Sequence, residues 1–395
     1  MKIPSAGTPI SIPDLMRGFL GSGTRDELEG GLKELTGDPW CRLTGSGTLA
    51  LYAILVALMR RSDRREVVLP AYTAPSLILP IRKAGLRPVL CEVSPRTLNA
   101  GSKELLDRVH SGTLAVMPVH MFGLPTEVHT ISEQLRGSGT TVIEDACSSM
   151  GSRIGGRLAG TLGDVGFYSF NRGKNLSTLS GGAIVSSRED LIPDLEKTLN
   201  DFPYPGIRRR LRMMAYIVGL ALAVRPLGYT LLYPVVSKLK YTELHTDFDI
   251  LAYTHFQARI GSSLLARTAQ IEQQRTENGR YLHQALNDVE GIRLAEEPEG
   301  CVPVYNQFPI RLRDERTRNT ALCAILQTGL EATILYPDPI HRIYAELWDG
   351  AGADPFPNAT DISRRLLLLP VHPLVPRVAL ERAVESLRKT VEMGG

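Results

Sequence analysis

Residues 142–186 read VIEDACSSMGSRIGGRLAGTLGDVGFYSFNRGKNLSTLSGGAIVS, and this stretch decides the class of fold. Three short runs in it are rich in branched and aromatic residues, which is typical of β-strands. Asp145 directly follows the first run, and Lys174 lies in a short loop after the second. Both side chains are therefore expected at the carboxyl ends of strands, where α/β proteins bind their ligands. The predicted strands are Thr140–Glu144, Val165–Ser169 and Gly182–Ser186.

The rest of the first 190 residues alternates between short β-rich runs and helical runs. Leu49–Met59 is almost wholly apolar, so this helix is expected to be buried on all sides. Strands that alternate with helices predict an α/β fold, with a mostly parallel sheet covered on both faces. The further strands are Glu66–Leu69, Pro88–Val93 and Leu114–Val119, and the further helices are Pro75–Gly85 and Thr126–Arg136.

The C-terminal part of the chain has a different pattern. A long polar helical run, Gln257–Asp288, is followed by two expected strands, Val302–Leu312 and Ala332–Tyr336. Helices are expected at Glu315–Gly329 and Pro376–Met393. Few strands with flanking helices fit a smaller α+β domain. At 395 residues the chain is too long for one compact core, and we expect a large domain at 1–245 and a small C-terminal domain at 246–395.

An apolar insertion at about 208–240 stands out from the large domain. A basic run precedes Met213–Val236, and Arg225 and Pro226 interrupt it. The uninterrupted apolar part, Met213–Val224, is shorter than the ~20 residues that a membrane-spanning helix needs. Two interpretations remain open: a helix hairpin that is buried or faces a partner subunit, and a peripheral surface that contacts the inner membrane or an apolar substrate.

Composition excludes several classes of protein. The formal net charge of +3 is small for this length and argues against a nucleic-acid binder. No C-x-x-C pair or histidine cluster accompanies the cysteines, so no metal site is predicted. Scattered cysteines and an N-terminus without a signal-peptide pattern indicate a cytoplasmic protein. The cysteines are Cys41, Cys91, Cys147, Cys301 and Cys323.

The order of polar residues suits pyridoxal phosphate (PLP) chemistry. This cofactor needs a lysine amine for its aldehyde, a carboxylate for its pyridine nitrogen and a binding site for its phosphate. Lys174 and Asp145 supply the first two, and Thr44–Thr48 runs into the apolar helix as a phosphate-binding helix N-terminus would. Taken singly, these features are an ordinary helix cap, a strand-end carboxylate and a loop lysine. Their order within one α/β domain carries the prediction.

Several motifs resemble those of the DegT/StrS-type sugar aminotransferases, which are fold-type I PLP enzymes of the aspartate aminotransferase superfamily. The resemblance covers nearly the whole chain. It implies a seven-stranded-type sheet between helices, a homodimer and a Schiff base between PLP and Lys174. The motifs are Ser46-Gly47-Thr48-x-Ala50-Leu51, Leu69-Pro70-x-Tyr72-Thr73, Gly85-x-x-Pro88-Val89, Pro118-Val119-His120-x-x-Gly123, Glu144-Asp145-Ala146, Ser169-Phe170-x-x-x-Lys174 and Leu369-Pro370-Val371-His372-Pro373.

The sequence departs from the family pattern at three places. Ser148 stands where the family usually has a glutamine near the ring hydroxyl, and Ala74 stands where it often has an aromatic residue on the pyridine. Tyr72 or His120 is expected to cover that ring face instead. The residues before Gln257 lack the asparagine that usually reaches the partner's phosphate. The predicted catalytic residues are Lys174 and Asp145, and the predicted cofactor-binding set is Ser46, Gly47, Thr48, Tyr72, His120, Asp145, Ser148, Ser169 and Lys174.

The resemblance predicts an aminotransferase that moves an amino group from glutamate or glutamine to a keto substrate, most simply a nucleotide-linked keto sugar. Lys174 argues against the family's dehydratases, which carry histidine at that position. A PLP decarboxylase or lyase, or a membrane-associated PLP-fold protein without catalysis, remains as an alternative.

Overall fold

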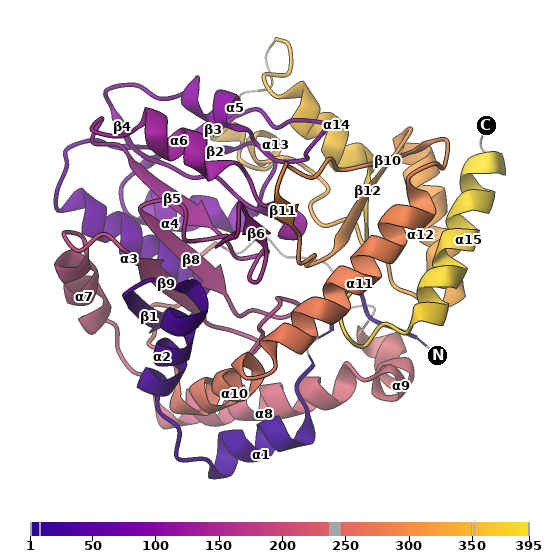
Figure 1. Ribbon diagram of the computed structural model, residues 1–395, viewed down its shortest axis with the longest axis horizontal. Helices are drawn as coiled ribbons and strands as arrows, with labels where there is room; N and C mark the ends of the chain where they lie inside the picture. The colour runs from indigo at the N-terminus through magenta and orange to yellow at the C-terminus, as the bar shows by residue number, and fades with distance from the viewer. Residues whose placement is uncertain (1, 8, 237–245, 349, 351, 394–395) are drawn as a thin grey trace.

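The computed structural model describes residues 2–7, 9–236, 246–348, 350 and 352–393, and a seven-stranded sheet lies at its centre (Figure 1). The order of its strands is β1-β9-β8-β5-β4-β2-β3. The pairs β2–β3, β2–β4, β4–β5 and β5–β8 are parallel, which confirms the predicted α/β fold with a mostly parallel sheet. The strands are β1 (Trp40–Thr44), β2 (Glu66–Pro70), β3 (Arg87–Cys91), β4 (Thr113–Val116), β5 (Thr141–Asp145), β8 (Val165–Ser169) and β9 (Gly182–Ser186).

The most apolar helix packs directly on this sheet. In α3 (Gly47–Met59) only Tyr52, Val56 and Met59 form a half-buried stripe from Leu49 onward, and the other side chains there are buried. The helix is therefore buried as expected except along this stripe. Such burial matches a sequence without a polar face, because most of the helix surface meets protein. The other helices of this half are α4 (Ile78–Lys83), α5 (Ser102–Leu106), α6 (Val128–Gln134) and α7 (Ile192–Asn200).

One strand of the sheet runs against its neighbours. β9 is antiparallel to both β8 and β1. The carboxyl ends of β8 and β1 therefore lie at the same edge of the sheet as the amino end of β9. Because the β8–β9 connection begins and ends at this edge, Lys174 within it stays close to the ends of the parallel strands.

The C-terminal part forms a second, smaller sheet with the order β10-β12-β13. A third small sheet joins the two parts, because β11 pairs with β6. The strands are β10 (Ile292–Leu294), β12 (Phe308–Leu312), β13 (Leu366–Leu369), β11 (Cys301–Val302), β6 (Arg153–Ile154) and β7 (Arg157–Leu158). The helices are α11 (Thr268–Leu286), α12 (Glu315–Thr328), α13 (Ile340–Ile343), α14 (Pro357–Arg365) and α15 (Arg377–Met393).

Three predicted elements differ from the structure. The expected strand Val302–Leu312 is divided between β11 and β12, since Pro303 has no N–H to donate to a ladder. Ala332–Tyr336 is not a strand; Thr333 alone bridges to Leu368 of β13. The single helix expected from Gln257 is two helices. Five strands with no counterpart among the predictions are β1, β6, β7, β10 and β13.

The long polar run breaks at Arg267, whose backbone leaves the helical region. The first of its two helices, α10 (His255–Leu265), packs against α1 (Ile12–Leu20) and α2 (Arg25–Thr36) near the N-terminus. Phe19 and Phe256 meet edge to face with their ring centroids 4.9 Å apart. The part of the chain beyond 246 is therefore tied to the first residues through α10.

The apolar insertion forms two helices, α8 (Ile207–Ala223) and α9 (Pro226–Val236), which meet at Arg225. One face of α8 is buried through Ile217 and Ala221, whereas Leu211 and Leu222 are exposed. Within the part of the chain that the structure describes, no helix is long and apolar enough to cross a membrane. The insertion is therefore neither a fully buried hairpin nor, in that part, a membrane span.

A pH-dependent change in stability is expected at Glu272 of α11, which lies against Gly151. Burial raises the pKa of its carboxyl from 4.5 to about 7, although Arg153 opposes the shift. The folded protein holds this proton more tightly than the unfolded chain, so the stabilisation is complete below pH 4.5 and is lost as the pH rises through about 7.

We predict that Glu272→Gln, which keeps the shape and removes the titration, gains stability over the unaltered protein between about pH 5.5 and about pH 8. Urea denaturation at both pH values measures this difference. The exposed Glu290→Gln serves as the control and should show no such trend. A constant difference between E272Q and the unaltered protein across this range would contradict the prediction.

Candidate active site

The polar residues predicted from the sequence gather at one edge of the large sheet. Asp145 ends β5 and Ser169 ends β8, while Ser46 and Gly47 follow the end of β1. Ser46 also forms a bridge with Gly181, the residue before β9. These contacts follow from the strand directions, because the reversed β9 returns its first residues to the carboxyl ends of its neighbours.

Asp145 is a buried carboxylate with a mixed electrostatic environment; it is 4% exposed. Burial raises the pKa of this carboxyl, and the Cys147 backbone N–H, the Cys147 thiol and the positive charge of Lys174 partly offset the shift. The Cys147 N–H donates to Asp145 Oδ1 at 2.9 Å. A cationic partner would favour the ionised form of such a buried carboxylate.

Lys174 points back to the loop that follows Asp145. Its Nζ donates a hydrogen bond to Ser148 Oγ at 2.8 Å, and its side chain is half-buried. The preceding residue, Gly173, has a φ of +82°, a left-handed conformation that a side chain would strain. The glycine therefore permits the turn that presents the lysine beside Ser148, the residue that replaces the family's glutamine.

The N-terminus of α3 forms a small cradle with the end of β8. Ser46 caps the helix by accepting the Leu49 N–H at 3.0 Å, so its hydroxyl is already engaged. The first-turn amides of Gly47 and Thr48 have no partners within the helix. A Cβ added at Gly47 would lie 2.9 Å from the Ser169 Cβ, which shows how closely the two elements approach. The cradle suits a phosphate group, since it combines helix amides with the Ser169 hydroxyl.

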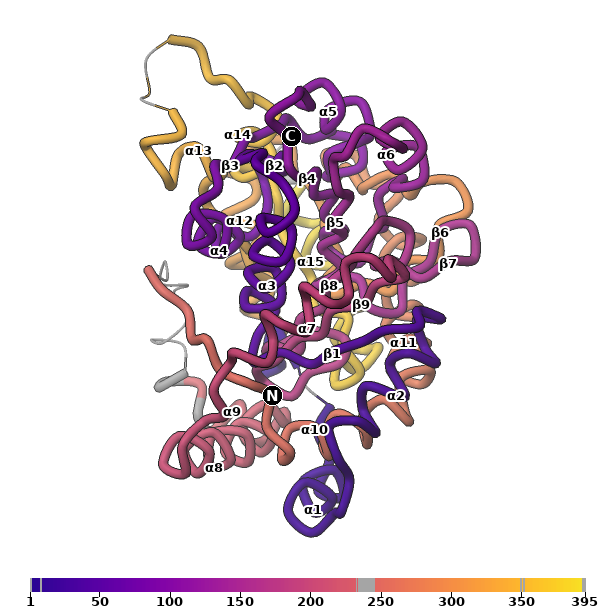
Figure 2. The backbone as a smooth tube through the Cα atoms, turned by 90° about the vertical axis from the view of Figure 1, so that its left-hand side faces the viewer, coloured from indigo at the N-terminus to yellow at the C-terminus, as the bar shows by residue number. Residues whose placement is uncertain are grey.

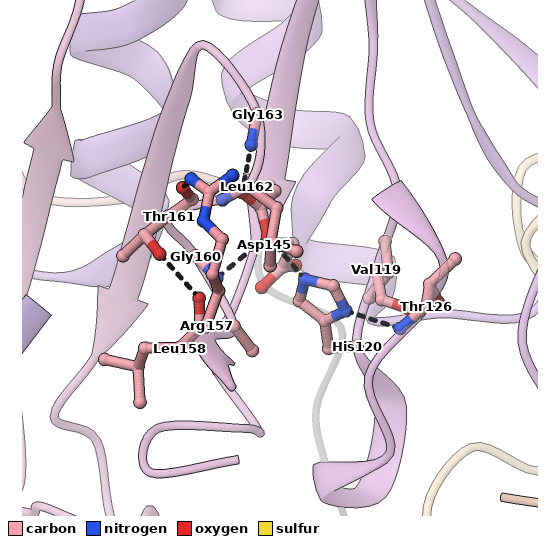
Figure 3. Close-up of polar contacts among 12 residues, drawn as sticks. Val119, His120, Thr126, Asp145, Arg157, Leu158, Gly160, Thr161, Leu162 and Gly163 are labelled. Carbon is pink, nitrogen blue, oxygen red and sulfur yellow. Dashed lines mark hydrogen bonds and ion pairs between the residues drawn. The ribbon is translucent and has the colours of Figure 1, made fainter. Parts of the chain in front are cut away.

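The structure places His120 behind the site rather than in it. Its side chain is fully buried; Nδ1 accepts the Thr126 N–H at 2.8 Å (Figure 3), and Nε2 lies 2.9 Å from Glu144 Oε2. Because Nδ1 accepts, Nε2 carries the proton and donates it to the carboxylate. The expectation that His120 covers the cofactor ring does not agree with these contacts, and we leave it out of the proposed ligands.

The carboxylate of Glu144 also holds the turn before β8. It accepts the backbone N–H groups of Gly160, Leu162 and Gly163. Adjacent residues of a strand point to opposite faces, so Glu144 and Asp145 have separate environments. His120 and Glu144 together thus support the strand that presents Asp145.

Tyr336 is a site residue that the sequence did not reveal. Burial is the main cause that raises the pKa of its phenol, and Asp145 and Cys147 raise it further, so these groups lie near one another. The buried Tyr72 supports Tyr336: its hydroxyl donates to the Tyr336 carbonyl at 3.3 Å, and the two rings meet edge to face. An aromatic side chain near Asp145 therefore comes from the C-terminal part, and Tyr72 supports it.

Cys147 was also not predicted as a site residue. Its Sγ would lie 3.2 Å from a Cβ at Gly47. Burial and then the charge of Asp145 raise the pKa of the thiol, so it stays protonated. Cys147 is thus a neutral hydrogen-bond donor with a short side chain, placed between Asp145 and the cradle. The only signal in the sequence was its place two residues after Asp145.

The segment before Gln257 packs against the cradle. The Leu251 carbonyl lies where a side chain at Gly45 would project. Gln257 Nε2 donates to Ser180 Oγ at 2.7 Å, and Asp249 forms an ion pair with Arg209 of the same chain. Asp249 is thus engaged within its own chain, in the segment where the family usually has its asparagine.

Residues 15–230 and 238–388 match the family model described as the DegT/DnrJ/EryC1/StrS aminotransferase family. The chain belongs to this family. It is therefore a transaminase. Asp145, Lys174 and the α3 cradle lie at the edge of the large sheet where its parallel strands end. In the part of the chain that the structure describes, no group of three or more His, Cys, Asp or Glu residues is arranged to hold a metal ion.

Two relatives match over most of the chain. The dTDP-4-dehydro-2,3,6-trideoxy-D-glucose 4-aminotransferase of Saccharopolyspora spinosa is 28% identical, covering 88% of this chain and 83% of its own. A UDP-N-acetyl-3-dehydro-alpha-D-glucosamine 3-aminotransferase of Acidithiobacillus ferrooxidans is 26% identical, with the same two coverages. The aminotransferase TlmJ from Streptoalloteichus hindustanus has the same fold, with a TM-score of 0.78 at 23% identity over 99% of this chain and 98% of that one.

We predict that Gly182→Ala destabilises the protein at the base of the cradle. The added Cβ would lie 2.6 Å from the Tyr168 carbonyl and 2.8 Å from the Gly47 nitrogen, both of which are backbone atoms. Such overpacking costs about 1–3 kcal/mol of unfolding free energy, which urea denaturation measures.

Gly30→Ala is the matched control. Gly30 lies inside α2 with nothing within 4 Å of an added Cβ, so alanine is expected to stabilise the helix by at most about 1 kcal/mol. Equal effects of the two substitutions would contradict the proposed close contact at Gly182.

Proposed function

We propose that this transaminase uses PLP to move an amino group from glutamate or glutamine to a keto carbon of a nucleotide-linked sugar. The observation that carries the proposal is the placement of Lys174 Nζ on Ser148 Oγ, on the loop that begins at the buried Asp145. An amine and a buried acid on two adjoining loops, beside a helix N-terminus, are the groups that PLP chemistry requires.

The residues present fit PLP by a test that does not depend on the family. Asp145 is a buried carboxyl whose raised pKa would be lowered by a cationic pyridine nitrogen. The amides of Gly47 and Thr48 and the hydroxyl of Ser169 would hold the phosphate, with Ser46 fixing the start of the helix. When bound, PLP supplies an aldehyde that condenses with amines and a ring that takes up the electrons of a broken C–H bond.

Lys174 is the group that moves protons. Its Nζ is a primary amine at the edge of the sheet, and we assign it the role of accepting the proton from the α-carbon of the amino donor. Ser148 Oγ holds this amine in position at 2.8 Å. Ser148 thus takes over a positioning role at the place where the family's longer glutamine would reach the ring.

The substrate class rests on the names of the relatives. The aminotransferases of Saccharopolyspora spinosa and Acidithiobacillus ferrooxidans are named for a dTDP-linked and a UDP-linked keto sugar. We therefore propose a nucleotide-linked keto sugar as the acceptor. Tyr336 near Asp145, held by Tyr72, is the aromatic surface proposed to lie over the reacting groups.

Further proposals follow from the family. We propose that the protein acts as a homodimer in the cytoplasm. We also propose that the chain divides into a large domain at 1–245 and a small domain at 246–395. Helix α10 links the small domain to α1 and α2.

We predict that Lys174→Ala abolishes transamination. Without Nζ the site has no amine to bind the PLP aldehyde or to accept the proton. The loss of activity should therefore exceed the roughly 10²–10⁴-fold typical of one general base. Transfer of ¹⁵N from labelled glutamate or glutamine to a nucleotide-linked keto sugar measures the activity, and borohydride treatment tests the covalent link to PLP.

The exposed Lys197→Ala on α7 is the control and should transfer label at the normal rate. Substantial label transfer by K174A would sink the assignment of Lys174. PLP bound by the unaltered protein without any transfer of label would point instead to a decarboxylase or lyase.

We predict that Asp145→Asn retains PLP but loses rate, by about a hundredfold or more, because the amide cannot balance a cationic ring nitrogen. Stopped-flow absorption with glutamate gives the rate of the first half-reaction. Glu144→Gln is the control, since this buried neighbour holds the turn before β8 and should lower the unfolding midpoint rather than the rate. A normal rate in D145N would contradict the role of Asp145.

A further inference from the structure

Exposed apolar side chains are concentrated at one end of the molecule. Of the thirteen large apolar side chains that are exposed in the described part of the chain, eleven lie within residues 12–20 and 204–231. Both views place α1, α8 and α9 at this same end of the molecule, at the bottom of the picture (Figures 1 and 2). We call it the apolar end, and its members are Ile12, Met16, Phe19, Leu20, Tyr204, Ile207, Leu211, Tyr216, Leu222, Leu227 and Leu231.

The exposure is large at several of these positions. Leu231 is 81% exposed, Leu20 is 80% and Leu227 is 75%. A soluble surface normally scatters such residues singly, and a contiguous group of them marks a surface that contacts something else.

Helix α8 is apolar on its outer face as well as on its inner face. Ile217, Ala221 and Val224 are buried in the core beneath the helix, and the Ser180 hydroxyl reaches the Met213 sulfur at 3.9 Å. Leu211 and Leu222 project on the other side. The helix is thus anchored by one apolar face and presents a second one as a fixed surface of the folded protein.

The charge of the insertion is of one sign. Tyr204–Val236 contains five arginines and no aspartate or glutamate. Arg208, Arg212 and Arg225 are exposed beside the apolar side chains. Arg209 pairs with Asp249, and the guanidinium of Arg210 lies over the ring of Tyr204 at 5.4 Å. The charges that remain face outward at the rim of the apolar end.

We propose that the apolar end docks in the plane of an anionic lipid membrane. Apolar side chains flanked by arginines are what an interfacial helix needs, since the apolar groups enter the acyl boundary and the guanidiniums meet the headgroups. A second copy of the chain fits less well: a two-fold contact would set the exposed arginines of α8 near those of the other copy, and like charges repel.

The docking would hold the candidate active site near the lipid surface. Ser180, which contacts Met213 of α8, directly precedes Gly181, and Gly181 bridges to Ser46 at the cradle. A chain of contacts through Met213, Ser180 and Gly181 thus connects α8 with the cradle. The proposal does not depend on the reaction catalysed, and its test needs no activity.

The test is flotation of the full chain with vesicles of phosphatidylcholine alone and of phosphatidylcholine mixed with phosphatidylglycerol. We expect binding only to the mixed vesicles, and its loss at high salt, because screening weakens the attraction of the arginines. Arg208→Gln with Arg212→Gln should weaken partitioning by about fivefold for each arginine removed. Leu222→Asn with Leu231→Asn should abolish it.

Matched controls change the same residue types at exposed positions elsewhere. Arg316→Gln with Arg382→Gln removes two charges from α12 and α15, and Val378→Asn removes an exposed apolar side chain from α15. Both should bind the mixed vesicles as the unaltered protein does. Circular dichroism of every variant establishes that it is folded.

Three results would overturn the proposal. The first is that the unaltered protein fails to float with the mixed vesicles. The second is that the variants at the apolar end bind as well as the controls. The third is a change of oligomeric state: if sedimentation velocity shows that L222N with L231N separates a dimer into monomers, the apolar end is an interface between copies. None of these results bears on the transaminase activity, which is measured separately.

Discussion

A close contact between two backbone segments holds the candidate site together. At the start of β9, Gly182 lies so near the Gly47 nitrogen that an added Cβ would be 2.8 Å from it, and Gly47 in turn lies against Ser169. With no side chains at these two glycines, the start of α3, the end of β8 and the start of β9 meet at one place. The loop that carries Lys174 leaves from β8 and returns to β9, so this contact also sets the position of the lysine.

The electrostatics of the site depend on burial. Asp145, Cys147 and Tyr336 all have pKa values raised first by removal from water, and the charge of Asp145 raises the pKa of the other two further. The ionised form of a buried carboxyl is stabilised when a cation or hydrogen-bond donors face it. Lys174 and the Cys147 N–H provide part of that, while Glu144 and His120 hold the neighbouring strand from behind.

The same protein carries a second surface of a different chemical kind. The outer faces of α1, α8 and α9 are apolar with a basic rim, and α8 touches the segment that leads to the cradle. A transaminase needs no such surface for its chemistry, because its reacting groups lie at the sheet edge. The apolar end is therefore best understood as a feature that places the enzyme, separate from the groups that transfer nitrogen.

The sequence by itself determined the fold class, the family and the order of the principal site residues. Strand-end positions are local properties, so Asp145, Ser169 and the residues before α3 were found from the short apolar runs beside them. The tertiary structure alone decided that β9 runs antiparallel to its neighbours, that His120 faces Glu144 and that Tyr336 lies near Asp145. The last two pairings join residues 24 and almost 200 positions apart, and β9 also pairs with β1 from near the start of the chain. No local pattern encodes which strands or loops will become neighbours. The insertion shows the same limit: its composition predicted apolar helices, but only packing decided which face each helix buries and which it leaves to a membrane or partner.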